Sequence, residues 1–305
     1  MTPPPSAPHR SSRNEVLVLQ GGGALGAYQA GVFKALADAG IAPHWIAGIS
    51  IGAINAAIIA GNPPALRIAR LRDFWDLVSS ELTALAPGED GPARQWFNEL
   101  SAGLVMLAGA PGFFRPRNPL FGDGGDPFAA LSIYDSAPLR DTLGELIDFD
   151  LLNEGPIRVS VGATAVLTGN LVWFDNRETR LGALPPGFPP VLVDGEPYWD
   201  GGLVSNTPLQ RVIDLGEACD LTIYQVDLFQ ARGTLPANLS EVLQRDKDIR
   251  YSSRTRLNTD LLQKLEELRL AGARLAERLP EAWANDPDLA RIAGIAPPGA
   301  ICIMH

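Results

Sequence analysis

The feature that most constrains the fold is a short apolar segment that runs into a serine flanked by glycines. Residues 45–49 are typical of a buried strand, and the small and aliphatic side chains of residues 53–60 indicate a buried helix. Gly48 and Gly52 lack Cβ atoms, so the chain between these two elements can turn tightly around Ser50. We therefore predict a strand, turn and helix that present the hydroxyl of Ser50 as a nucleophile above the edge of a sheet.

A second glycine-rich segment follows the first predicted strand. The strand over residues 15–20 runs directly into Gly-Gly-Gly-Ala-Leu-Gly, residues 21–26, and a helix follows to about residue 39. The first, third and sixth residues of this segment also match the dinucleotide-binding fingerprint, which requires an acidic residue at the end of the next strand. That strand ends in Ser50 instead. A loop of N–H donors beside a serine turn is the arrangement that an oxyanion hole requires.

A serine nucleophile needs a general base, and the chain has three histidines to supply an imidazole. His9 lies in a Pro- and Ser-rich leader, and His305 is the last residue, where fraying works against precise placement. His44 is six residues from Ser50 along one strand, which at ~3.3 Å per residue separates the two by about 20 Å. We therefore expect a carboxylate to act as the base in a two-residue arrangement with Ser50.

An Asp-Gly-Gly sequence at residues 200–202 supplies such a carboxylate, although the same sequence is also common in plain turns. Together with the segments at 21–26 and 48–52, in this order, it resembles the three motifs of the patatin-like phospholipase family. The resemblance covers roughly residues 16–213. It implies an α/β protein with a three-layer α/β/α fold, a mainly parallel central sheet and a helical C-terminal extension. It also implies lipid acyl hydrolase activity through a serine–aspartate dyad.

Carried over residue by residue, the resemblance assigns Ser50 as the nucleophile and Asp200 as the base. It assigns the oxyanion hole to the N–H groups of Gly21, Gly22 and Gly23. The other motif glycines are Gly26, Gly48, Gly52, Gly201 and Gly202. The chain departs from the family at Leu25, where Arg or Lys is usual, so a positive charge near the oxyanion or a lipid phosphate is missing. Neither a metal nor an organic cofactor is implied.

Three alternatives to a phospholipase stay open. The enzyme could be an esterase or thioesterase that acts on acyl substrates other than phospholipids. It could be an inactive relative whose glycine loop holds an anion, although the intact Ser50 and Asp200 argue against this. It could also be an α/β-hydrolase with a histidine triad, which would require His305 as the base.

The charge and the cysteine content limit the binding partners and the cellular compartment that we expect for the protein. A net charge of −10 makes binding to nucleic acid or to an anionic lipid surface unfavourable overall. Cys219 and Cys302 are too few and too far apart for a disulfide framework, and with three histidines they form no zinc-ligand spacing. The N-terminus has no apolar signal region, and no segment approaches the ~20 apolar residues of a membrane span. We expect a cytoplasmic protein whose partner is an acyl lipid.

The domain boundaries follow from these patterns. Residues 1–14 are expected to be a disordered leader, residues 15–230 the catalytic domain and residues 231–305 a helical extension packed on the domain or on a partner. Leucines at helical spacing between residues 257 and 279 predict an amphipathic helix. This helix could dock on the domain, join a second subunit or make transient contact with a membrane surface.

Several further elements are predicted between the motifs. Residues 157–166 and 171–174 should pair as a hairpin, and residues 221–227 should form a last core strand. Helices are expected over residues 65–80 and from about residue 136 to 147. Within the irregular stretch between these helices, two apolar groups could form a lid, an acyl-chain wall or a satellite core. They are residues 100–107 and the pair Phe113 and Phe114.

Overall fold

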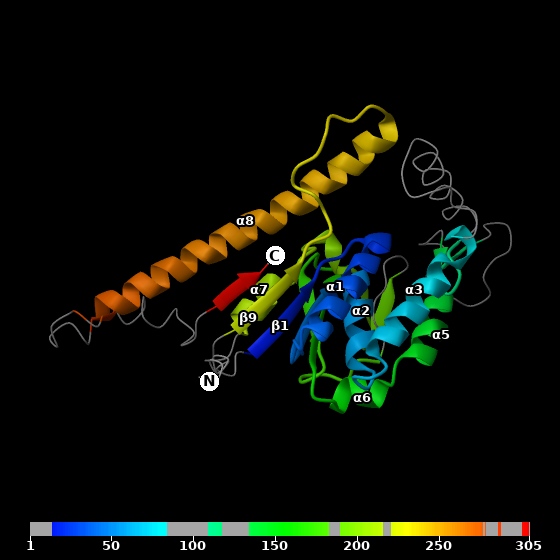
Figure 1. Cartoon of the computed structure of the whole chain (residues 1–305), viewed down its shortest axis with the longest axis horizontal. Coiled ribbons are helices and arrows are strands. Elements are labelled where there is room, and N and C mark those ends of the chain that lie inside the picture. Colours follow the sequence, from blue (N-terminus) through cyan, green and yellow to red (C-terminus); the bar gives the residue numbers. More distant parts are fainter. Residues whose placement is uncertain are drawn as a thin grey trace, which may run out of the picture.

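The computed structural model shows an eight-stranded sheet with helices on both faces (Figure 1). The residues that it describes are 14–83, 109–117, 134–182, 190–215, 221–276, 278, 286–287 and 301–304. The apolar segment 100–107, residues 1–13 of the predicted leader, Cys219 and His305 lie outside these ranges, whereas Asn14, the last residue of the predicted leader, begins the first strand.

The strand order in the sheet is β10-β9-β1-β2-β5-β8-β7, with β6 also paired to β5. Strands β10, β9, β1, β2 and β5 run parallel to one another, whereas β6, β7 and β8 are antiparallel to their neighbours. The sheet is therefore mainly parallel. Its strands are β1 (Asn14–Leu19), β2 (Trp45–Ile49), β5 (Arg158–Ala165), β6 (Leu171–Asp175), β7 (Val191–Val193), β8 (Glu196–Asp200), β9 (Leu221–Val226) and β10 (Ile301–Met304).

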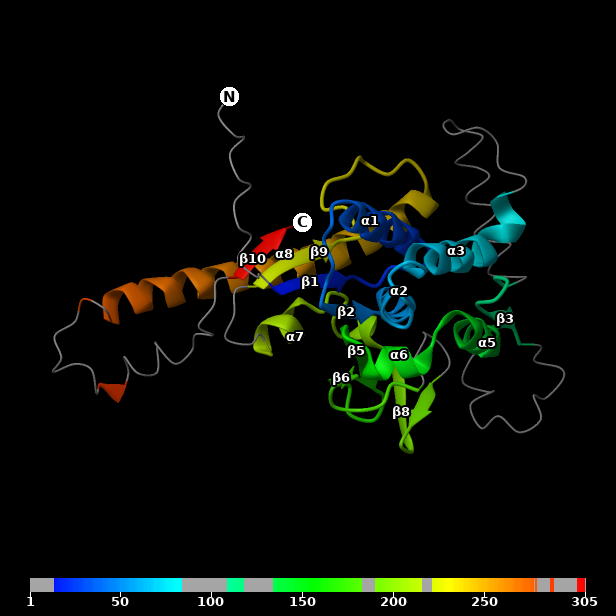
Figure 2. The same cartoon turned by 60° about the horizontal axis from the view of Figure 1, so that its bottom comes forward.

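The helices of the described residues cover the two faces unequally (Figure 2). One face carries the short 3-10 helix η1 and most of the α-helices, and the other carries α7. A separate two-stranded ribbon joins β3 (Arg115–Pro116) to β4 (Tyr134–Asp135). The helices are η1 (Gly23–Gly26), α1 (Ala27–Asp38), α2 (Ile51–Ala60), α3 (Arg67–Thr83), α5 (Ala137–Leu146), α6 (Phe149–Glu154), η3 (Gly201–Leu203), α7 (Leu209–Asp214) and α8 (Leu239–Ala276).

The alternation of side chains along β1 produces the three layers. Leu17 and Leu19 point into the larger hydrophobic cluster, which includes α2, whereas Val16 and Val18 point into a smaller cluster with α7. All four side chains are almost fully buried. A strand buried on both faces is expected where helices cover both sides of a parallel sheet. The predicted three-layer α/β/α fold is confirmed.

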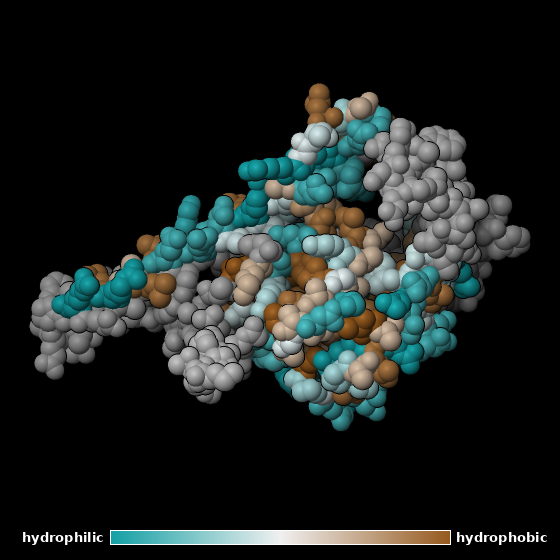
Figure 3. All heavy atoms as spheres, in the orientation of Figure 1, coloured by the Kyte–Doolittle hydropathy of each residue, from teal (hydrophilic) through white to brown (hydrophobic). Residues whose placement is uncertain are grey.

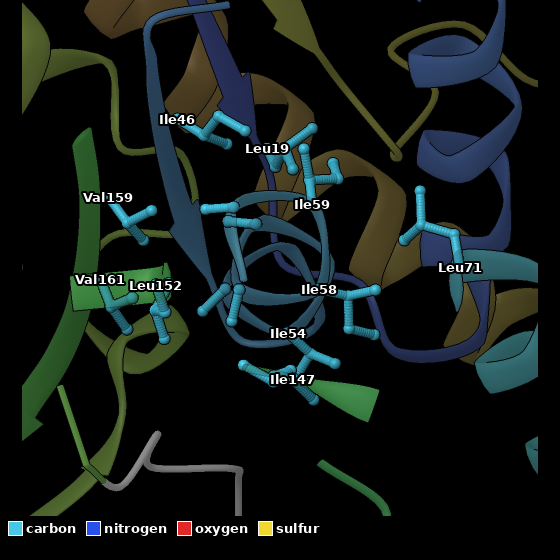
Figure 4. Packing of buried hydrophobic residues seen from close by; sticks show 14 of the residues in the cluster. Leu19, Ile46, Ile54, Ile58, Ile59, Leu71, Ile147, Leu152, Val159 and Val161 are labelled. Atoms are coloured by element: carbon cyan, nitrogen blue, oxygen red, sulfur yellow. The ribbon is translucent and has the colours of Figure 1, made fainter. Parts of the chain in front are cut away.

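Helix α2 occupies the centre of the larger cluster, and each of its ten residues is buried (Figure 4). Two glycines allow it to approach the sheet this closely. A methyl group added at Gly52 would collide with the backbone carbonyl of Leu19 at the end of β1, and one added at Gly48 would collide with the backbone of Gly52. Both colliding groups are backbone atoms, which cannot move aside as a side-chain tip can.

The register of the sheet brings the ends of β2 and β8 together on β5. Ile49, the last residue of β2, is paired with Gly162 of β5. The next residue of β5, Ala163, is paired with Asp200, the last residue of β8. Strand β6 occupies the other edge of β5, opposite both Gly162 and Ala163, so β2 and β8 share one edge of β5. The residue that follows Ile49 and the residue Asp200 therefore lie next to each other along that edge.

The predicted strands and the hairpin of β5 and β6 are confirmed, and two features at the C-terminal end differ from expectation. Helix α8 begins at Leu239, well before the predicted leucine-rich segment, because polar and charged residues extend it toward the N-terminus. Strand β10 was not predicted. It pairs in parallel with β9, so the segment 231–305 contributes a strand to the central sheet in addition to a helix.

Replacing Gly52 with Ala should destabilise the protein, because the new methyl group has to displace the backbone of β1. Overpacking of this kind typically lowers the free energy of unfolding by about 1–3 kcal/mol. The change can be measured by urea unfolding of Gly52→Ala beside wild type.

Gly144 provides the matched control, since it is an exposed residue within α5 and a methyl group added there meets no atom within 4 Å. Gly144→Ala should raise the free energy of unfolding by about 0.5–1 kcal/mol. A Gly52→Ala protein as stable as wild type would contradict the close approach of α2 to β1.

Candidate active site

Ser50 stands at the junction of β2 and α2 in a backbone conformation that side chains rarely adopt. Its φ is 54° and its ψ is −125°, which is close to the first central position of a type II′ turn, where glycine is usual. Among the described residues other than glycine, the only other positive φ belongs to Asp194, in the turn between β7 and β8. A strained backbone of this kind raises the free energy of the folded state by about 1–3 kcal/mol and often marks a functional position.

The turn leaves the Ser50 side chain half-buried and without a hydrogen bond to the described residues. The carbonyl of Ser50 accepts the first helical hydrogen bonds, from the N–H of Ala53 at 2.9 Å and of Ile54 at 3.2 Å. Within the described part of the chain its hydroxyl has no hydrogen-bond partner, and it does not cap the helix. The N-terminal end of α2, with its positive dipole end, therefore lies directly behind a free hydroxyl.

The glycine loop lies beside Ser50, as the sequence predicts. A methyl group added at Gly21 would be 3.1 Å from the Cβ atom of Ser50. The backbone of Gly21 is held by Asn206, whose carbonyl accepts its N–H at 3.1 Å and whose Nδ2 donates to its carbonyl at 2.7 Å. The expected role of Gly21 as an oxyanion donor is therefore corrected, because its N–H already has a partner.

The next two residues of the loop remain available. Gly22 is partly exposed and Gly23 is exposed, and no hydrogen bond of either N–H is found among the described residues. Gly23 has a φ of 58°, a conformation that glycine adopts without steric cost. The structure thus leaves the N–H groups of Gly22 and Gly23, which directly follow Gly21, as candidate oxyanion donors.

Asp200 ends β8 and begins the short helix η3. Its Oδ1 accepts the N–H of Gly202 at 2.8 Å, and its backbone carbonyl accepts the hydroxyl of Thr164 at 2.9 Å. A methyl group added at Gly201 would collide with the carbonyl of Gly162 on β5, so only a glycine lets the chain turn this tightly at the end of β8. These contacts fix the Asp200 backbone and the direction of its carboxylate.

The sheet places Ser50 and Asp200 on the same edge of β5, at the point where the ends of β2 and β8 meet. Ile49 is paired with Gly162 and Asp200 with the next residue, Ala163, so the backbone segments that carry the two side chains are neighbours along β5. No hydrogen bond between the Ser50 hydroxyl and the Asp200 carboxylate is found in the described structure. Catalytic hydrogen bonds are often loose in the absence of substrate and tighten in the complex.

Asn206 is a site residue that the sequence motifs do not reveal. Besides its two hydrogen bonds to Gly21, its Oδ1 lies 2.8 Å from the position that a methyl group on Gly202 would occupy. It therefore lies between the glycine loop and the Asp-Gly-Gly segment and connects them. The only sequence signal is its position in a short polar segment, Ser-Asn-Thr-Pro, a few residues after Asp200.

Two buried amides hold the ends of the glycine loop from below. The Nε2 of Gln29 on α1 donates to the carbonyl of Gln20 at 2.7 Å, and the Nδ2 of Asn55 on α2 donates to the carbonyl of Gly26 at 3.0 Å. Asn55 also donates to the Oε1 of Gln29 at 2.9 Å and accepts from the indole of Trp75 at 3.1 Å. The loop is therefore fixed at both ends by fully buried polar groups.

The other residues that the sequence analysis considered for a functional role lie away from Ser50 and Asp200. His44 precedes β2 at the end of the strand opposite Ser50, and its ring contacts the carbonyl of Glu15 at 2.7 Å. Among the described residues no group of His, Cys, Asp or Glu is arranged to hold a metal ion. Phe113 and Phe114 pack in an aromatic chain with Phe74 and Tyr134, and Phe113 joins the larger hydrophobic cluster.

A serine held in a strained turn between a parallel strand and a buried helix is how α/β serine hydrolases present their nucleophile. Comparison with known proteins gives the family. The sequence model of the family described as patatin-like phospholipase matches residues 17–213, and a second one, described as patatin phospholipase, matches residues 249–305. The chain belongs to the patatin-like phospholipase family, whose members are hydrolases of lipid esters.

Individual relatives are distant. Patatin-like phospholipase domain-containing protein 7 from Rattus norvegicus is 27% identical over 203 residues, which cover 66% of this chain and 13% of the rat protein. Among solved structures, VipD from Legionella pneumophila is 15% identical with a TM-score of 0.37, over 87% of this chain and 55% of that chain. None of the described helices combines the length and the apolar character needed to cross a bilayer.

The strain at Ser50 predicts an unusual order of stability among its variants. Ser50→Gly should be more stable than Ser50→Ala by about 1 kcal/mol, because glycine adopts a positive φ without the steric cost that a Cβ atom brings. Urea unfolding of the two variants measures the difference. If the alanine variant were the more stable one, the backbone of Ser50 would not be strained.

Proposed function

We propose that the protein is a serine-dependent acyl hydrolase that cleaves carboxylic esters of acyl lipids through Ser50 and Asp200. The observation that carries this proposal is the strained backbone of Ser50, beside Asp200 on one edge of β5 and beside a glycine loop with two N–H groups that have no partner among the described residues. Membership in a family of lipid-ester hydrolases supports it.

In the first half of the reaction the Ser50 hydroxyl attacks the carbonyl carbon of the ester while the Asp200 carboxylate accepts its proton. The N–H groups of Gly22 and Gly23 stabilise the negative charge that develops on the carbonyl oxygen. Asp200 then returns the proton to the leaving alcohol as the C–O bond breaks. The product of this half is an ester between the acyl group and Ser50.

In the second half a water molecule attacks the acyl-enzyme, and Asp200 again serves as the base. The same two N–H groups stabilise the second oxyanion, and collapse of the intermediate releases the fatty acid and the free Ser50 hydroxyl. The positive end of α2, which begins directly after Ser50, favours negative charge at this position throughout.

The surroundings of the site suit an apolar acyl chain. Leu25 and Tyr28 beside the glycine loop are 42% and 64% exposed, and Leu203 and Val204 after Asp200 are 52% and 41% exposed. Large apolar side chains exposed on both motif segments are suited to contact with a hydrocarbon chain. Leu25 stands where the family usually has a basic residue, and this favours neutral acyl esters or thioesters over substrates with an anionic headgroup.

Active-site labelling with a fluorophosphonate probe tests the assignment of nucleophile and base. The probe should label wild type, and both Ser50→Ala and Asp200→Asn should abolish or strongly reduce labelling, since the first removes the nucleophile and the second removes the base. Labelling is measured by gel fluorescence or intact mass.

Asp227→Asn and His305→Ala are the controls and should be labelled as wild type. Asp227 is a carboxylate at the carboxyl end of β9, on the same edge of the sheet as Ser50. Loss of labelling with His305→Ala together with normal labelling of Asp200→Asn would favour a histidine triad instead. Wild-type protein that is not labelled would favour an anion-binding relative without activity.

A charge introduced at Leu25 should change the headgroup preference. Leu25→Arg should improve kcat/KM for vesicles of an anionic phospholipid by about 5-fold relative to a neutral p-nitrophenyl ester, as expected for one exposed ion pair of about 1 kcal/mol. Leu25→Met keeps the side chain apolar and should leave the ratio unchanged. An unchanged ratio in Leu25→Arg would show that no anionic group of the substrate lies near this position.

A further inference from the structure

Among its described side chains, helix α8 contacts the catalytic domain through the hydroxyl of Thr255, the guanidinium of Arg245 and the ring of Tyr251. Most of its side chains are exposed, and the projecting part of the helix is largely hydrophilic, with scattered hydrophobic side chains (Figure 3). Leu257 and Leu268, for example, are 69% and 67% exposed. Among the described side chains of α8, the buried ones are Ser252 and Thr255, at 5% and 4% exposure. The hydroxyl of Ser252 has no hydrogen-bond partner among the described residues, so of these two buried hydroxyls it is that of Thr255 that bonds to the domain.

The hydroxyl of Thr255 contacts Gln20, the residue that precedes the glycine loop. Gln20, the residue before Gly21, is fully buried, and its Nε2 donates to the hydroxyls of Thr255 at 3.1 Å and Thr207 at 3.2 Å. Its Oε1 accepts the N–H of Leu228 at 2.6 Å. Both hydrogens of the amide and its oxygen are therefore satisfied, and one of these three bonds goes to α8.

In the cluster formed by Gln20, Thr207 and Thr255, the donor and the acceptor of each hydrogen bond can be assigned. The Thr255 hydroxyl donates to the carbonyl of Tyr251 at 3.0 Å, so the 2.8 Å contact between the two threonine hydroxyls has Thr207 as its donor. The ring of Tyr251 also packs on Phe229, with ring centroids 4.7 Å apart. Removing the Thr255 hydroxyl would leave both Gln20 and Thr207 with a buried donor that has lost its acceptor.

The cluster holds the glycine loop from two sides. Gln20 precedes Gly21 directly, whereas Thr207 follows Asn206, whose side chain and backbone both bond to Gly21. The position of Gly21 in turn determines where the N–H groups of Gly22 and Gly23 point. Thr255 is therefore hydrogen-bonded to Gln20, which precedes the glycine loop, and to Thr207, which follows Asn206.

We propose that Thr255 of α8 is a positioning residue for the glycine loop, so that docking of this helix orients the oxyanion donors beside Ser50. The proposal deepens the hydrolase function above and rests on it for its catalytic consequence. Its structural part, the dependence of loop order on the Thr255 hydroxyl, can be tested without any activity.

Three variants isolate the hydroxyl. Thr255→Val keeps the shape of the side chain but removes the hydrogen bonds, and Thr255→Ser restores the hydroxyl. Thr259→Val is the matched control, because Thr259 lies one turn further along α8 and, among the described residues, its hydroxyl bonds to the carbonyl of Thr255 alone, at 2.9 Å. It therefore makes the same chemical change on the same helix without touching Gln20 or Thr207.

Amide hydrogen–deuterium exchange of the full chain measures the order of the loop. The N–H groups of Gln20 and Gly21 are protected by bonds to Val226 and Asn206. In Thr255→Val their peptide should exchange at least 10-fold faster than in wild type, whereas Thr255→Ser and Thr259→Val should exchange at the wild-type rate. Equal exchange in Thr255→Val and wild type would overturn the proposal.

Ester hydrolysis measures the consequence for the oxyanion hole. Thr255→Val should lower kcat for a p-nitrophenyl ester by roughly 10-fold with little change in KM, because misplaced donors weaken transition-state stabilisation more than substrate binding. Thr255→Ser should recover most of kcat, which a loss of packing alone would not explain. Equal losses in Thr255→Val and Thr259→Val would also overturn the proposal, because they would reflect a general effect on the helix.

The two readouts separate this proposal from the proposed function. If wild type neither hydrolyses esters nor reacts with the fluorophosphonate probe, the hydrolase function fails, and the exchange experiment still decides whether Thr255 orders the loop. If wild type is active and the loop exchanges alike in all four proteins, the function stands and the role of Thr255 is refuted.

Discussion

The structure depends on a backbone turn at Ser50 that is unfavourable by itself. A positive φ at a residue with a Cβ atom costs energy, so the surrounding contacts have to hold the turn in place. Helix α2 does so, because its ten buried residues fix it against the sheet and thereby fix the direction in which the chain leaves β2. Gly52 permits this contact, since its bare Cα allows the helix to reach the carbonyl of Leu19. Strain at one residue is thus maintained by apolar packing of the helix that follows it.

Local patterns in the sequence were sufficient for the elements that position the site. The apolar run of β2, the small residues of α2 and the glycines around Ser50 each identify their structure from a few neighbouring residues, and the hairpin of β5 and β6 follows from alternation and a turn. The placement of Ser50 beside Asp200 on one edge of β5 could not be predicted in this way. It arises from the register of β5 with two different strands, one parallel and one antiparallel.

The residues that sequence analysis missed act through contacts between distant segments. Gly21 could be expected to donate its N–H to an oxyanion until the structure showed the carbonyl of Asn206, 185 positions away, in that place. Gln20 reads as the last residue of an apolar strand, and only the fold reveals that its side chain meets Thr207 and Thr255. Such amides and hydroxyls carry no periodic signal, because a single buried polar group needs only one partner, and its partner can come from anywhere in the chain.

Strand β10 makes the C-terminal end of the chain a part of the central sheet. Helix α8 connects β9 to β10, and these strands are parallel neighbours at one edge of the sheet. The helix thus lies within the crossover connection of two parallel neighbouring strands. The strand that completes this edge of the sheet therefore comes after α8 in the chain, so formation of the edge requires the segment that follows the helix.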